Sequence, residues 1–155
     1  MNMKKSELLQ VWPLLKDGKF GKVSGEGKIK YVRMLATLSP VVKGFESYRE
    51  TVVEKLMSQY DGFNEKLAEA QAYEAYIKDS NQEQPKMTED EYKDFLKIVQ
   101  EYNKSVVDAL NEEGSKEVNV KYDRLTPTEF GCFCDSNDFT GEQALALMDV
   151  MCDIN

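Results

Sequence analysis

The sequence contains no histidine, and only three of its 155 residues are cysteines. General acid–base catalysis near neutral pH most often uses histidine, so the commonest catalytic group is missing. An odd number of cysteines, all in the last quarter of the chain, makes no disulfide framework. They are Cys132, Cys134 and Cys152. A tetrahedral zinc site needs four nitrogen or sulfur ligands, so three cysteines are one too few, and the chain has no histidine to supply the fourth. We therefore expect buried thiols, no bound metal and no cofactor.

Long hydrophobic runs are also missing. No apolar stretch approaches the roughly 20 residues that a membrane-spanning helix needs. The N-terminal sequence MNMKKSELLQ has lysines but no apolar stretch behind them, so it is not typical of a signal peptide. We therefore expect a cytoplasmic protein with no membrane partner.

The first distinctive segment is KDGKFGKVSGEGKIK, residues 16–30, which is rich in glycine and lysine. A phosphate-binding P-loop requires four residues between its glycines and a hydroxyl residue after its lysine. Here Gly21 and Gly27 enclose five residues, and Lys28 is followed by Ile29. The segment therefore favours a basic connection between two helices over a nucleotide site.

Apolar residues then recur at intervals of three and four from Leu35 to Ile77. This spacing predicts one long helix over 28–78, or two helices in line with a kink at Pro40. Part of it keeps a heptad seam, made of Leu38, Val42, Phe45, Arg49, Val52 and Leu56. Fifty-one helical residues would extend about 75 Å, which predicts an elongated molecule.

A second helix is predicted to fold back along the first. Thr88 and Glu91 form a capping-box pattern, and Gly114 is a stop signal. Residues 117–122 alternate as in a short strand, and two further capping boxes begin at Thr126 and Thr140. We predict a mainly α single domain: a long antiparallel helical hairpin over 28–112, with a small α(+β) head formed by 1–27 and 113–155.

Net charge is −8 and is unevenly distributed. Residues 1–60 carry eleven Lys and Arg against six Asp and Glu, whereas residues 61–155 carry nine against twenty-two. Two interpretations are open: a charged partner at one end, or neutralisation of the basic residues 16–33 by the acidic C-terminal part inside one fold. The predicted organisation favours the second.

The order of features resembles a known group of sequences. The chain contains K-V-S-x-x-x-K-I-K-Y from Lys22, then L-x-x-L-x-P-x-x-K-x-F-E-x-Y-R from Leu35, and V-x-V-K-Y-D-R-L-T-P-x-E-F from Val118. This pattern is similar to that of small uncharacterised proteins encoded by tailed phages and prophages that contain a long helical hairpin. The resemblance implies a phage origin, a place in the host cell cytoplasm and an accessory role. It transfers no catalytic residues.

We therefore expect a non-enzymatic protein that acts through protein–protein interaction, in virion (tail) assembly. The alternative is an acidic inhibitor of a host nucleic-acid-binding or defence complex. The partner would be a phage structural protein, a host protein or a second copy, since the seam serves a hairpin or a dimer equally. Phe20 and Tyr31 could stack on the bases of a nucleic acid. The negative net charge of the chain, however, disfavours a nucleic acid as the partner. The candidate partner-binding residues are Tyr73, Tyr76, Lys19, Lys22, Lys28 and Lys30.

Overall fold

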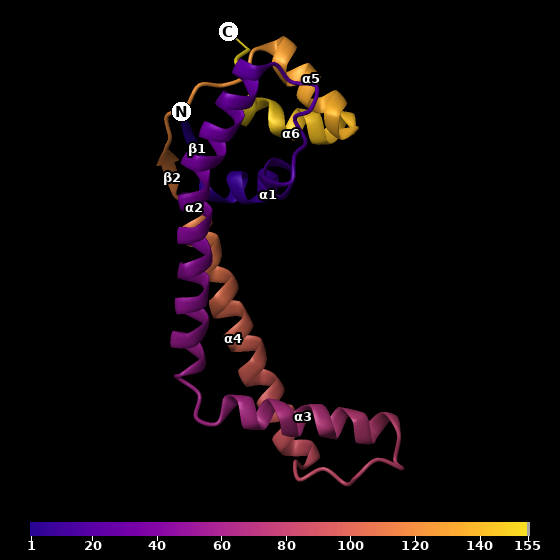
Figure 1. The fold of residues 1–155 in the computed structure, drawn as a ribbon. Helices are drawn as coiled ribbons and strands as arrows, with labels where there is room; N and C mark the ends of the chain where they lie inside the picture. The colour runs from indigo at the N-terminus through magenta and orange to yellow at the C-terminus, as the bar shows by residue number, and fades with distance from the viewer. Residues whose placement is uncertain (155) are drawn as a thin grey trace. The chain divides into compact units, whose positions relative to one another are not determined.

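The computed structural model describes residues 1–154 and is mainly helical (Figure 1). Its elements in chain order are β1 (Asn2–Lys4), α1 (Lys5–Lys16), α2 (Gly25–Met57), α3 (Phe63–Lys78), α4 (Glu89–Ser115), β2 (Glu117–Asn119), α5 (Pro127–Asn137) and α6 (Gly141–Met151). The strands pair antiparallel, with Met3 opposite Val118. The predicted mainly α fold with a small α+β part is confirmed. Within the described residues, no helix is both long enough and apolar enough to cross a bilayer.

Three predicted helix starts are formed by the expected capping boxes. Before α4, the backbone N–H of Glu91 donates to Thr88 Oγ1 at 3.2 Å and the N–H of Thr88 donates to the Glu91 carboxylate at 2.9 Å. Thr126 and Thr140 make the equivalent reciprocal bonds at α5 and α6. Each box satisfies N–H groups that have no partner inside the helix.

The chain divides into two compact units, and each boundary falls inside a long helix. Unit 1 is Met1–Ser47 together with the chain from Glu112 onward, and unit 2 is Tyr48–Asn111. This partition differs from the predicted division into a hairpin over 28–112 and a head. The prediction of a single domain stays a prediction.

The prediction of one continuous helix over 28–78, or of two helices that meet at Pro40, is wrong. Helix α2 passes through Pro40 and ends at Met57, and α3 begins only at Phe63. Pro40 is exposed, so water can satisfy the carbonyl that its missing N–H leaves free. The break instead covers residues 58–62, and Gly62, just before α3, has a left-handed φ of 64° that a right-handed helix cannot include.

Each unit has its own apolar core, and the predicted heptad seam is divided between them. Leu38 and Val42 lie in the core of unit 1, whereas Leu56 packs against that of unit 2. The fully buried large side chains of unit 1 are Leu8, Leu15, Tyr31, Met34, Leu38, Leu125, Phe133, Leu147 and Met151.

The core of unit 2 is aromatic and lies where α3 crosses α4 (Figure 1). The Phe63 ring lies 5.5 Å from Phe95 and 5.0 Å from Tyr102, centroid to centroid. Near the other end of α3, Tyr73 meets Tyr92 at the start of α4. Large rings therefore bridge helices whose backbones cross at an angle.

Candidate functional site

The glycine–lysine segment is attached to α5 in unit 1. The backbone N–H of Lys19 donates to Asn137 Oδ1 at 2.6 Å, and Asn137 Nδ2 donates back to the Lys19 carbonyl at 2.7 Å. Lys22 donates from its backbone N–H to Ser136 Oγ and from Nζ to the Asp135 carbonyl. The interpretation that this segment packs beside the acidic C-terminal part is supported.

Lys30 is engaged by carboxylates. Its Nζ lies 3.1 Å from Glu129 Oε2 and 3.2 Å from Glu26 Oε1. The hydrogen bond to Glu129 is the main cause of the raised pKa of Lys30. The pKa of Glu129 is lowered, first by the backbone N–H of Thr126 and further by Lys30 and Ser24. The charge of Lys30 is thus compensated inside unit 1.

Close packing explains two glycines of this segment. A Cβ on Gly18 would lie 2.5 Å from the Phe133 ring and 2.7 Å from the Tyr31 hydroxyl oxygen. A Cβ on Gly27 would lie 2.6 Å from Val23. The Tyr31 hydroxyl donates to the Leu15 carbonyl, and burial raises the pKa of Tyr31 to about 12. These glycines permit close packing of the segment against its neighbours in unit 1.

The remaining predicted partner-binding residues are dispersed. Tyr73 is half-buried with its ring 4.6 Å from that of Tyr92, whose hydroxyl donates to Glu74 at 2.6 Å. Tyr76 and Lys28 are also half-buried, in unit 2 and unit 1 respectively. A role in partner binding stays a prediction for all six residues: Tyr73, Tyr76, Lys19, Lys22, Lys28 and Lys30.

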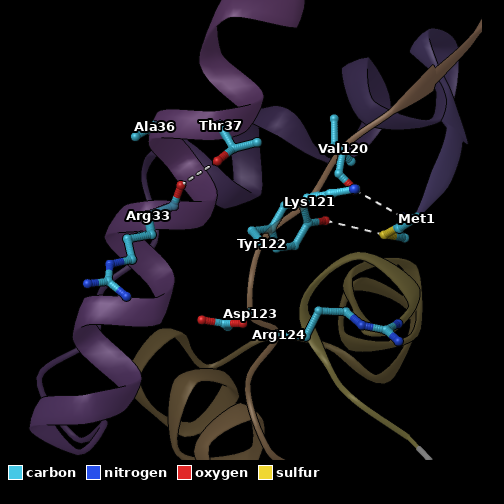
Figure 2. Close-up of a pocket in the computed structure, with 9 residues that line it drawn as sticks. All are labelled: Met1, Arg33, Ala36, Thr37, Val120, Lys121, Tyr122, Asp123 and Arg124. Carbon is cyan, nitrogen blue, oxygen red and sulfur yellow. Dashed lines mark hydrogen bonds between the residues drawn. The ribbon is translucent and has the colours of Figure 1, made fainter.

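A groove in unit 1 is the better candidate site. It has a volume of about 730 Å³, within the range of ligand-binding sites. Figure 2 shows α2, with Arg33, Ala36 and Thr37, beside the chain segment that carries Val120 to Arg124; in this view Thr37 points toward that segment and the Arg33 guanidinium away from it. The lining residues are Met1, Arg33, Ala36, Thr37, Val120, Lys121, Tyr122, Asp123 and Arg124.

The helical wall follows from the burial pattern of α2. Tyr31, Met34 and Leu38 enter the core, so the residues on the other faces point outward. Ala36 is exposed and small, which leaves room beside the helix. The Thr37 hydroxyl donates to the Arg33 carbonyl at 3.0 Å, so that its hydrogen is used within α2.

The opposite wall is held by side chains that reach α6. The Tyr122 hydroxyl donates to the Val150 carbonyl at 2.9 Å, and burial raises the pKa of Tyr122 to about 12. Arg124 donates from Nη1 to the Asp149 carbonyl at 3.4 Å, and its Nη2 lies 3.6 Å from Asp153 Oδ1. The wall is therefore fixed to the rest of unit 1.

The groove is cationic in a chain of net charge −8. Arg33, Lys121 and Arg124 line it with a single acidic residue, Asp123. Within residues 1–154, Arg33 and Lys121 make no ion pair, and both are exposed. Two uncompensated cations on facing walls favour an anionic or acidic occupant.

Groups suited to catalysis are sparse in the described part of the chain. Burial raises the pKa of the Cys134 and Cys152 thiols, which lowers their nucleophilicity at neutral pH. Residues 1–154 contain no cluster of three or more His, Cys, Asp or Glu that could hold a metal ion. The groove lining itself contains no serine, cysteine or histidine.

No family model, curated protein or solved structure matches the chain.

The groove was missed from the sequence, although half of its signal is present there. Val120 and Tyr122 are apolar and alternate with the charged Lys121 and Asp123, and Arg124 follows them. That pattern indicates an extended segment with charged side chains on one face. The sequence does not say that α2 faces this stretch, because the two walls lie more than eighty residues apart along the chain.

Proposed function

We propose that this chain is a non-enzymatic accessory protein of a phage or prophage that acts by binding another protein, with virion tail assembly as its role. The groove of unit 1 would be its recognition surface. The observation that carries the proposal is the pair of exposed, uncompensated cations, Arg33 and Lys121, on facing walls of that groove. The resemblance to phage and prophage proteins supports the origin.

The chemistry of the lining supports binding more than turnover. Its polar groups are cations, one carboxylate, and hydroxyls of Thr37 and Tyr122 that already donate to backbone carbonyls. Tyr122 has a pKa of about 12 and stays protonated at neutral pH, so it is a poor general base. Such a surface provides charge and shape for recognition.

Affinity purification of the tagged full chain from its native cells tests the proposal. We expect a discrete partner at constant stoichiometry with the wild type, which the R33E/K121E double variant loses. The matched control is K86E/K104E, which makes the same charge change at two exposed lysines of unit 2. Capture that is equal for both variants would contradict the groove as the recognition surface.

A second candidate, the acidic inhibitor of a host nucleic-acid-binding complex, is favoured by the charge of unit 2. Residues 48–111 carry fourteen Asp and Glu against eight Lys and Arg. Three consecutive acids, Glu89 to Glu91, are exposed in the first turn of α4. A captured partner that is basic, and that K86E/K104E and R33E/K121E both retain but added salt releases, would support inhibition over assembly.

A further inference from the structure

The backbone of residues 121–124 is unpaired along the groove. On one side of it, Val120 exchanges two hydrogen bonds with Met1, each 2.9 Å long. On the other side, the Leu125 N–H donates to the Met151 carbonyl and its own carbonyl accepts from Asp153. Between these points, the backbone N–H and C=O groups of 121–124 make no hydrogen bond to any other described residue.

The same residues have the character of a strand. Val120 is buried and Tyr122 and Arg124 are half-buried, whereas Lys121 and Asp123 are exposed, an alternation with a period of two over 120–124. Figure 2 shows this segment running as an extended chain past the face of α2 that carries Ala36 and Thr37. An extended segment with free backbone groups is a template for another strand.

We propose that an extended acidic segment of the partner protein binds in this groove by adding a β-strand to residues 121–124. This inference rests on the proposed function and names its mode and the chemistry of the partner. Backbone hydrogen bonds to 121–124 supply the affinity, and side chains at alternate positions supply the specificity. Four paired residues span about 13 Å.

The charges of the groove indicate why the segment is acidic. Lys121 projects from the pairing segment itself, and Arg33 stands on the facing helix. Carboxylates on the added strand would meet these cations, and a guanidinium binds a carboxylate through two parallel hydrogen bonds. The small side chain of Ala36 leaves space for the backbone of the added strand between α2 and 121–124.

Amide hydrogen exchange of the ¹⁵N-labelled full chain tests the inference. The probe is a capped hexapeptide that alternates glutamate with threonine and valine, compared with a peptide in which glutamine replaces each glutamate. At saturation with the acidic peptide, we expect exchange of amides within 121–124 to slow by at least about tenfold. We expect the glutamine peptide to bind about tenfold more weakly.

Two N-methylated versions of the acidic peptide isolate the backbone pairing. One carries N-methyl groups at odd positions and the other at even positions, so each removes the donors of one strand edge. Only one edge of an added strand pairs with 121–124, so one version is expected to lose binding and the other to keep it. Equal binding of both versions would overturn strand addition.

Charge variants separate this inference from the proposed function. R33E and K121E are each expected to weaken the acidic peptide about tenfold, and K104E to leave its affinity unchanged. An acidic peptide that leaves the resonances of 33–37 and 120–124 unmoved overturns strand addition. If R33E/K121E still abolishes partner capture in that case, the proposed function survives; if capture is unaffected, both are wrong.

Discussion

Glu129 shows how one residue organises much of unit 1. Its carboxylate accepts from the Thr126 N–H at 2.9 Å, from Ser24 Oγ at 3.1 Å and from Lys30 Nζ at 3.1 Å. It therefore caps its own helix and also holds the start of α2. These contacts explain how the lysine-rich start of α2 is held beside the acidic C-terminal part.

Glu129→Gln is predicted to destabilise the protein by about 1 kcal/mol at neutral pH. Glutamine can still cap the helix, as Gln143 does in α6, so the variant removes mainly the charge. The pKa of Glu129 is lowered in the folded state. Its charge therefore stabilises the protein at pH values above the unfolded pKa, and this stabilisation is lost as pH falls through the folded pKa. Urea unfolding across this pH range measures the difference.

The control for this prediction is Glu89→Gln. Glu89 also has a lowered pKa, through its hydrogen bond to Lys93, but both side chains are largely exposed. We expect a smaller effect there, since exposed ion pairs contribute little. If the loss of stability in Glu129→Gln is the same at acid pH as at neutral pH, the charge of Glu129 is not the cause of that loss.

Among the elements, α3 begins directly after Gly62, whose left-handed backbone separates it from the turns that follow α2. Gly62→Ala is predicted to lower the free energy of unfolding by about 1–2 kcal/mol, because the left-handed φ at this position strains any residue with a Cβ. Gly62→Asn should cost less, because asparagine tolerates this conformation better. The space around a Cβ at position 62 is adequate, so backbone strain is the cause.

Gly44→Ala is the opposing control in the same urea experiment. Gly44 lies inside α2 with open space where its Cβ would stand, so alanine should stabilise the protein by about 0.5–1 kcal/mol. Equal effects of the two alanine substitutions would contradict the account of the helix break.

Local signals allowed many elements to be predicted from the sequence. The starts of α4, α5 and α6 follow from capping boxes, in which the residues that interact are three positions apart. The predicted division at Pro40 was wrong because spacing alone does not report exposure or backbone conformation. The groove could not be predicted, since α2 and 120–124 meet only through the tertiary fold.

At the scale of the whole molecule, each unit has a core of its own, and this separates the effects of core mutations. Phe95→Ala is predicted to cost about 3–5 kcal/mol, because Phe95 is 3% exposed in the core of unit 2. We expect amide exchange to rise within 48–111, while the amides near Leu38 and Leu147 keep their protection. Exchange mapped by NMR or mass spectrometry checks this.

Phe133→Ala is the matched control, since Phe133 is fully buried in the core of unit 1. It should give the reverse pattern, with faster exchange in unit 1 than in unit 2. If both variants raise amide exchange evenly along the chain, the two units unfold together. That result would contradict the prediction that each core stabilises its own unit.

The central claim is that the groove of unit 1 contacts the partner, and site-specific photo-cross-linking in native cells tests it most directly. The photoreactive residue p-benzoylphenylalanine would replace the exposed Asp123 in the groove or the exposed Asn103 on α4 of unit 2. We expect a covalent adduct with one protein from position 123 and none from position 103. An adduct from position 103 alone would contradict it.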